Sequence, residues 1–350
     1  MFWESRKDHK MKKGTIIIAE AGVNHNGDMN LARKLIDAAE EANVDYIKFQ
    51  TFKADKVVIK KALRADYQVK NSKNKSDTQY QMLKRLELSE EDFIDLNNYC
   101  ESRGINFLST AFDIEGLEFL NRLGVRLFKI PSGEITNYGY LKKVSSFKKP
   151  VILSTGMSEI HEIKAALDLL TENITIQDIT ILHCNSAYPT PYSDVNLYAM
   201  QDIKNKFGVD VGYSDHTLGI EIPFASVVLG ASVIEKHFTL DRQLEGPDHL
   251  ASLEPNELKE MVKGIRNIEE ALSGTRKKEV SISEKENKVH VRRSLYFKRD
   301  VKNGEKVTQD MFVALRPGDG ISPMQIPSLI GRIAKKDLMQ YSKVKVTHFE

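Results

Sequence analysis

The most restrictive feature of this 350-residue sequence is a regular alternation of short apolar runs with longer amphipathic segments. The apolar runs are predicted to be strands, at residues 15–19, 45–50, 105–109, 125–131, 150–154, 179–184, 209–214 and 231–237. Most of the segments between them have helical spacing, and two of these end at Gly104 and Gly124. Eight β–α units in about 260 residues predict a (β/α)8 barrel. An open doubly wound sheet is the alternative, but no GxGxxG turn follows the first strand.

The pattern changes on either side of this region. Residues 1–13 are predicted to be a polar leader, and residues 14–274 the barrel, with a long polar insertion after the second strand that runs to about Leu88. Residues 275–290 are charged and poor in large apolar side chains, which indicates a linker. In residues 291–350, Gly, Pro and Asp punctuate short runs, which predicts a small β-rich domain.

Composition excludes several kinds of partner. The formal net charge is +2 and no basic stripe is present, which argues against a nucleic-acid partner. No apolar run approaches the roughly 20 residues that cross a bilayer, so we expect no membrane span. The two cysteines, Cys100 and Cys184, cannot build a disulfide framework and are typical of a cytoplasmic protein.

Two histidines follow the last two predicted strands. His216 comes directly after the seventh and His237 ends the eighth. Neighbouring strands lie about 4.8 Å apart, so both imidazoles could bind one divalent ion. The alternative is a pair of loop histidines with no joint role. The carboxylates of Asp215, Glu235, Asp241 and Asp248 in the same region favour the metal site.

In a barrel the chemistry lies at the carboxyl ends of the strands, and the residues there are polar. One group is cationic and rich in hydroxyls, which suits a phosphate and a carboxylate: Lys48, Thr110, Lys129, Ser132, Ser154 and Ser214. A second group could bind the hydroxyls of a polyol: Glu20, Gln50, Glu134 and Tyr188. A single serine or threonine is more often a turn or helix cap. A strand lysine, in contrast, must reach a polar site or be buried unpaired at a cost of several kcal/mol.

A series of motifs appears in the order seen in the sialic acid synthase family. They are IAEAGVNHNG, KFQ, FLSTAFD, FKIPSGEI, LSTGM, HCNSAYPTP, GYSDHT, EKHFT and GPDHLASLEP, and they extend from about Ile16 to Glu254. In addition, RSL…RPGDGISP resembles the antifreeze-like (SAF) domain of that family. The resemblance implies a barrel followed by an SAF domain, and an enzyme that makes nonulosonic acids. Such enzymes condense phosphoenolpyruvate with an N-acylated mannosamine and water, and release phosphate.

The resemblance also implies roles for individual residues. Phosphoenolpyruvate would be bound by Lys48, Thr110, Lys129, Ser132, Ser154, Ser214 and either Asn185 or Ser186. The sugar would be bound by Glu20, Gln50, Tyr188 and Asp248, with Glu20 also a catalytic candidate and Glu134 positioning or deprotonating the attacking water. His216 and His237 would bind Mn²⁺, with Mg²⁺, Co²⁺ or Zn²⁺ as alternatives. Arg316 would reach the sugar from the partner subunit of a domain-swapped homodimer.

The acceptor sugar is the most open point. The insertion ALRADYQ…SDTQYQMLKRLELS and the motif GPDHLASLEP resemble the legionaminic acid synthases, which use 2,4-diacetamido-2,4,6-trideoxymannose. The alternatives are an N-acetylneuraminate synthase, which uses N-acetylmannosamine, and a pseudaminic acid synthase. Outside this reaction, a Schiff-base pyruvate aldolase could use Lys48 or Lys129, and an inactive relative would bind sugar without turnover.

Overall fold

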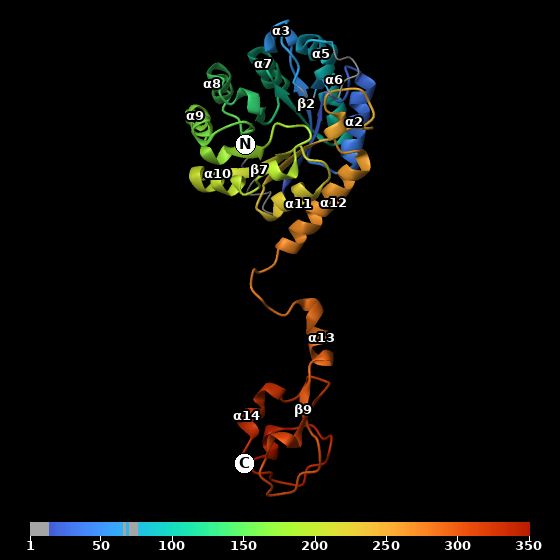
Figure 1. The fold of residues 1–350 in the computed structure, drawn as a ribbon, viewed down its shortest axis with the longest axis vertical. Coiled ribbons are helices and arrows are strands. Elements are labelled where there is room, and N and C mark those ends of the chain that lie inside the picture. Colours follow the sequence, from blue (N-terminus) through green and yellow to red (C-terminus); the bar gives the residue numbers. More distant parts are fainter. Residues whose placement is uncertain (1–13, 66–67, 70–75) are drawn as a thin grey trace. The chain divides into compact units, whose positions relative to one another are not determined.

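The computed structural model describes residues 14–65, 68–69 and 76–350, so the predicted leader lies outside the described residues. The chain divides into two compact units at Ser273 and Gly274. Figure 1 shows the larger unit in blue to orange and the smaller in orange to red. Within the described ranges, no helix combines the length and the apolar character needed to cross a membrane.

The larger unit is the predicted (β/α)8 barrel. Its eight parallel strands follow the order β3-β2-β1-β8-β7-β6-β5-β4, so the ladder runs almost the whole way round, with β3 and β4 at its two ends. The strands are β1 (Ile16–Gly22), β2 (Tyr46–Thr51), β3 (Asn106–Ala111), β4 (Phe128–Ile130), β5 (Val151–Ser154), β6 (Ile179–Cys184), β7 (Asp210–Asp215) and β8 (Val233–His237).

Helices surround the strands (Figure 1). They are α2 (Met29–Glu41), α3 (Ala54–Val57), α5 (Gln79–Leu86), α6 (Glu90–Arg103), α7 (Ile114–Leu123), α8 (Tyr138–Ser146), α9 (Ile160–Leu170), α10 (Ala199–Phe207), α11 (Glu221–Val228) and α12 (Pro255–Leu272). Helices α3 and α5 lie in the region predicted only as a polar insertion. A capping box is the local signal for α5, because Thr78 and Gln81 satisfy each other's backbone N–H groups.

Alternate residues of each strand face opposite sides of the barrel wall. In β1, Ile17 and Ala19 pack in the main core against the helices, whereas Ile18 packs in a separate cluster. That second cluster lies inside the barrel and consists of Ile18, Leu108, Ile152, Leu182 and Val233, with Tyr46 and Leu127 packed against it. The barrel is therefore filled by side chains, and its chemistry is confined to the ends of the strands.

The smaller unit contains α13 (Ile282–Val291), β9 (Ser294–Phe297), β10 (Phe312–Leu315) and α14 (Ile326–Leu329). Strands β9 and β10 pair antiparallel. Phe297, Val307 and Phe349 belong to its own core, as expected for a small independent domain. Helix α13 occupies most of the segment predicted as a linker. It begins with a capping box between Ser281 and Glu284 and has no buried residue. The charged composition therefore belongs to a solvent-exposed helix and not to an irregular linker.

Candidate active site

A polar layer lies directly above the apolar layer inside the barrel. Residues i and i+2 of a strand face the same side. The residue two positions after an apolar residue of the interior therefore also faces the inside of the barrel. The pairs are Ile18 and Glu20, Tyr46 and Lys48, Leu108 and Thr110, Leu127 and Lys129, Ile152 and Ser154, Leu182 and Cys184, and Val233 and Glu235. Seven strands thus contribute polar side chains to one level of the barrel.

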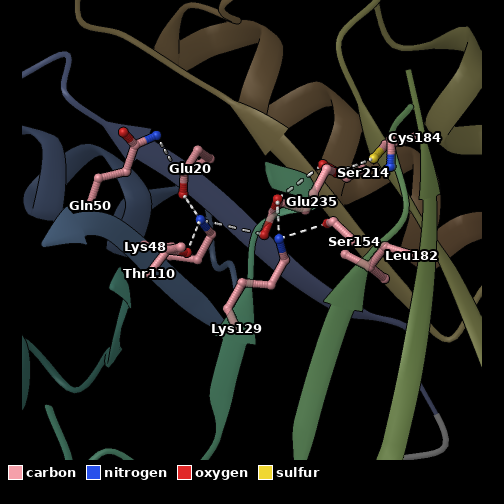
Figure 2. Close-up of polar contacts among 12 residues, drawn as sticks. Glu20, Lys48, Gln50, Thr110, Lys129, Ser154, Leu182, Cys184, Ser214 and Glu235 are labelled. Carbon is pink, nitrogen blue, oxygen red and sulfur yellow. Dashed lines mark hydrogen bonds and ion pairs between the residues drawn. The ribbon is translucent and has the colours of Figure 1, made fainter. Parts of the chain in front are cut away.

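The first lysine of this layer, Lys48, is fully enclosed by polar groups. Its Nζ lies 2.6 Å from Glu20 Oε2 and donates to Thr110 Oγ1 at 2.8 Å. Gln50 donates in turn to Glu20 Oε1 at 3.1 Å. Figure 2 shows these side chains converging from β1, β2 and β3. Three predicted elements of the site, the lysine, the glutamate and the glutamine, are therefore in direct contact.

The second lysine, Lys129, approaches from β4. Its Nζ donates to Ser154 Oγ at 2.8 Å and lies 3.3 Å from Glu235 Oε1. Glu235 lies between the two lysines (Figure 2), 3.7 Å from Lys48 Nζ, and accepts a hydrogen bond from Ser214 at 3.0 Å. The predicted groups of β2, β3, β4, β5 and β7 are thus joined through one carboxylate of β8.

The electrostatics of this layer hold opposite charges together away from water. Burial and Glu235 raise the pKa of Glu20 to about 7, although Lys48 opposes the shift. Burial also raises the pKa of Glu235, but Lys129 and Lys48 outweigh it and bring that pKa to about 2. Burial alone would lower the pKa of Lys48, but Glu20 and Glu235 outweigh burial and raise it. Burial lowers the pKa of Lys129. Two lysine side chains fixed in this way could contact an anionic ligand.

A group of hydroxyls packs tightly at the ends of β4, β5 and β6. Ser132 begins the short helix η2 (Ser132–Glu134) and accepts a hydrogen bond from Gly156 N at 2.8 Å. A Cβ atom at Gly156 would lie 2.3 Å from Ser186 Oγ, 2.9 Å from Ser132 Oγ and 3.2 Å from Cys184 Sγ. Any side chain at this position would force Ser186 and Ser132 to move. The hydroxyls gathered here are donors that would suit a phosphate group.

The two predicted histidines are adjacent at the ends of β7 and β8. Their ring centroids are 5.5 Å apart, and the ring of Tyr188 lies 4.1 Å from His216 and 5.8 Å from His237. Both histidines are buried. Burial lowers the pKa of His216 to about 4 and that of His237 well below its usual range. Both rings are therefore neutral at pH 7, the form in which imidazole binds a metal.

The hydrogen bonds of the histidines fit a metal site. His216 Nδ1 lies 2.5 Å from the carbonyl oxygen of Asn185. Since a carbonyl can only accept, Nδ1 carries the proton and Nε2 keeps its lone pair, as in most metal-bound histidines. In the described part of the chain, His237 Nδ1 is buried without a hydrogen-bond partner. Within the same residues, no group of three or more His, Cys, Asp and Glu side chains could hold a metal ion. The protein therefore offers two nitrogen ligands.

Three predicted residues are not joined to this network by a described contact. Glu134 is half-buried in η2 and accepts a hydrogen bond from Asn137 at 2.6 Å. Asp248 is buried in the segment after β8, and burial raises the pKa of its carboxyl to about 6. Arg316 belongs to the smaller unit, where its Nε donates to the Val291 carbonyl at 2.9 Å.

The structure also distinguishes residues that the sequence left equivalent. Asn185 Oδ1 accepts a hydrogen bond from Ala187 N at 2.8 Å and so stabilises its own turn, whereas Ser186 Oγ lies close to Gly156. The sequence placed Glu235 only among several carboxylates near the histidines, whereas the structure places it between Lys48 and Lys129. The signal was present, because Glu235 precedes His237 by two residues and therefore faces the same side of β8.

Comparisons with known proteins agree with this architecture. Residues 35–277 match the NeuB family and residues 292–339 match the SAF domain. The chain is 51% identical to N,N'-diacetyllegionaminic acid synthase of Campylobacter jejuni, over 93% of this chain and 97% of that protein. It is 34% identical to a pseudaminic acid synthase of the same species, over 96% and 97%.

Among solved structures, the chain resembles N-acetylneuraminic acid synthetase of Leptospira borgpetersenii, crystallised with citrate. The TM-score is 0.68 and the identity 36%, covering 78% of this chain and 90% of the other. The family match covers most of the barrel, and the relatives match over nearly their whole length. This chain is therefore a member of the NeuB family that carries a C-terminal SAF domain.

Proposed function

We propose that this protein is an N,N'-diacetyllegionaminic acid synthase. The observation that carries the proposal is the buried pair Lys48 and Lys129 in one layer of the barrel, beside two neutral histidines. In the reaction, C3 of phosphoenolpyruvate forms a bond with the aldehyde carbon of 2,4-diacetamido-2,4,6-trideoxymannose. Water adds to C2, and phosphate leaves by cleavage of its C–O bond. The identity of 51% with a legionaminic acid synthase, against 34% with a pseudaminic acid synthase, supports this sugar.

The anion site would bind phosphoenolpyruvate. In this proposal Lys48 and Thr110 bind the carboxylate, and Lys129 and Ser154 lie between the carboxylate and the phosphate. Ser214 contributes a further hydroxyl. The closeness of the Ser132 and Ser186 hydroxyls to Gly156 supports binding of the phosphate by these two serines, with the Asn185 side chain engaged in its own turn. Charge-assisted hydrogen bonds of this kind are the strong ones in a site from which water is excluded.

His216 and His237 would hold a divalent ion, most suitably Mn²⁺, with Mg²⁺, Co²⁺ or Zn²⁺ as alternatives. When bound, such an ion polarises an aldehyde oxygen as a Lewis acid. The carbonyl of Asn185 fixes the tautomer of His216, and the ring of Tyr188 packs against both imidazoles. The remaining coordination positions are left to water and substrate, as in catalytic metal sites generally.

The sugar would lie on the β1–β2 side of the barrel mouth. We assign its hydroxyl and acetamido contacts to Glu20, Gln50, Tyr188 and Asp248. Glu20 is also suited to proton transfer, because burial and Glu235 bring its pKa to about 7 even though Lys48 opposes the shift. Glu134 would position or deprotonate the attacking water, and its hydrogen bond from Asn137 holds the carboxylate at the rim.

The SAF domain would complete the site of a second subunit. We propose that Arg316 reaches the N-acyl group of the sugar bound by the partner barrel in a domain-swapped homodimer. Its guanidinium is exposed within the smaller unit and available for such a contact. The two cysteines are free thiols, which is consistent with a cytoplasmic enzyme.

The proposal is tested by phosphate release with purified protein, Mn²⁺ and phosphoenolpyruvate. We expect phosphate release to depend on sugar, with kcat/KM highest for 2,4-diacetamido-2,4,6-trideoxymannose and lower for N-acetylmannosamine. A higher kcat/KM for N-acetylmannosamine would instead identify an N-acetylneuraminate synthase. No phosphate release with either sugar would contradict the proposed reaction. The acceptor sugar of the pseudaminic acid synthases tests the pseudaminic alternative in the same assay.

Asp248→Asn should stabilise the protein while weakening sugar binding. Burial raises the Asp248 pKa to about 6, above its value in the unfolded chain, so the stability that Asp248 contributes is full below about pH 4 and is lost as pH rises through 6. Asparagine does not ionise. We expect the variant to be about 1–3 kcal/mol more stable than the wild type at pH 8 and nearly equal at pH 4. Urea unfolding at both pH values measures this, and the sugar KM should rise.

A further inference from the structure

Asp215 and Lys236 form a buried ion pair on the side of β7 and β8 that faces away from the barrel interior. Asp215 precedes His216, and Lys236 precedes His237, so both point away from the barrel interior. Lys236 Nζ lies 2.5 Å from Asp215 Oδ2, and both side chains are 0% exposed. The two residues are also register partners in the β7–β8 ladder. The pair therefore joins the backbone positions directly before both histidines.

Thr217 closes this arrangement around His216. Asp215 Oδ1 accepts from Thr217 N at 3.0 Å, and Asp215 Oδ2 accepts from Thr217 Oγ1 at 3.1 Å. Lys236 Nζ donates to the Thr217 carbonyl at 2.7 Å. The residues on both sides of His216 are thus bound to the residue that precedes His237. On the other side, Thr190 N donates to the His216 carbonyl at 2.8 Å, so the loop has little freedom to move.

Stability alone is a poor explanation for this pair. Taking two charges out of water costs so much that well-packed apolar residues often stabilise a protein equally or better. What a buried pair provides is fixed geometry, because each charge loses its partner if the strands or the loop shift. Between β7 and β8, a fixed geometry sets the distance between the imidazoles of His216 and His237.

We propose that Asp215, Thr217 and Lys236 are positioning residues that set the spacing of His216 and His237 for a divalent ion. The inference rests on the proposed function, because it takes these histidines as the metal ligands. None of the three residues touches the ion or a substrate in this proposal. They act through the backbone, as outer partners of metal ligands commonly do.

The test is Asp215→Asn/Lys236→Met in the full-length protein. Both replacements are close in size to the originals, and together they leave no unpaired buried charge. Mn²⁺ affinity is measured without substrate, from the electron paramagnetic resonance signal of free Mn²⁺. We expect affinity to fall by about 10- to 100-fold, the usual effect of losing an outer-shell partner. Turnover should return toward the wild-type kcat at saturating Mn²⁺, which a damaged fold would not allow.

A control variant removes a partly exposed ion pair at the other end of the barrel. Arg266 Nη2 lies 2.9 Å from Asp45 Oδ2, near the amino end of β2. Asp45→Asn/Arg266→Met should lower the unfolding temperature and leave Mn²⁺ affinity unchanged. Equal loss of Mn²⁺ affinity in both double variants would overturn the inference, since it would then reflect general destabilisation.

Two other outcomes are decisive. If the wild type binds Mn²⁺ and Asp215→Asn/Lys236→Met binds it equally well, the positioning role is wrong while the metal assignment stands. If the wild type does not bind Mn²⁺, the metal assignment itself fails. Should the double variant not fold, Thr217→Val keeps the ion pair and removes one hydrogen bond of the network. A smaller loss of affinity in that variant supports the inference, and unchanged affinity contradicts it.

Discussion

His237→Ala is expected to abolish Mn²⁺ binding and to reduce phosphate release by about a thousandfold or more. A Lewis-acidic ion contributes several kcal/mol to transition-state stabilisation, and each 1.4 kcal/mol is a tenfold change in rate. The fold should survive the substitution. Burial lowers the His237 pKa well below its usual range, so the ring is neutral and its removal leaves no unpaired buried charge. Steady-state phosphate release and Mn²⁺ titration measure the two effects.

The control for this variant is His161→Ala. His161 lies in the first turn of α9, next to Glu159, with its side chain 76% exposed. We expect wild-type turnover and wild-type Mn²⁺ affinity from it. Wild-type Mn²⁺ affinity in His237→Ala would show that this histidine is not a metal ligand. Loss of turnover with Mn²⁺ affinity retained would show that His237 acts on the substrates and does not bind the metal.

The barrel could be predicted because its signal is local and repeated. Each strand combines a buried apolar run with a following helix, and α6 adds both a capping box at Ser89 and a left-handed glycine, Gly104, at its end. The predicted strand at 45–50 differs from β2 by one residue at each end. The predicted strand at 125–131 shortens to Phe128–Ile130, because apolar flanking residues look the same whether or not they join a ladder.

For the candidate site, the sequence predicts which residues lie at the strand ends but not which of them are in contact. Parallel strands bring Lys48, Lys129 and the two histidines to one end of the barrel, and this follows from the topology alone. Which neighbour each side chain meets depends on the pleat. Lys236 and His237 both stand at the end of the eighth predicted strand, but adjacent residues of a strand face opposite sides. The structure directs Lys236 outward to Asp215, and it is Glu235 that shares the space of His237.

The elements that escaped prediction are those whose signals are short. Helices α3 and α5 lie in a polar insertion, and α13 has no buried residue from which a periodic apolar pattern could arise. Helices α5 and α13 each begin with a capping box, formed by Thr78 with Gln81 and by Ser281 with Glu284. Hydrophobic periodicity detects elements that cover a core, so exposed helices require attention to capping boxes.

Lys129→Met should raise the KM for phosphoenolpyruvate by about 30-fold or more. Truncating one partner of a buried, hydrogen-bonded charge pair costs about 2–5 kcal/mol, and 1.4 kcal/mol is tenfold in affinity. Part of the loss would come from Glu235. It lies 3.3 Å from Lys129 Nζ, and without that ammonium its carboxylate would repel an anionic ligand. Lys129→Met/Glu235→Gln removes both charges and should recover some affinity, while remaining weaker than the wild type.

The matched control is Lys149→Met, which removes a partly buried lysine that donates to the Val125 carbonyl at 2.9 Å, outside the polar layer. We expect its KM for phosphoenolpyruvate to stay at the wild-type value.

Lys129 also provides a test that distinguishes the synthase from a Schiff-base aldolase. Burial lowers the Lys129 pKa, and a less basic lysine favours imine formation. Borohydride treatment of the wild type with pyruvate should leave the protein mass unchanged, because the proposed synthase reaction forms no imine at Lys129. A reduced pyruvate adduct at Lys129, absent from Lys129→Met, would instead identify the aldolase.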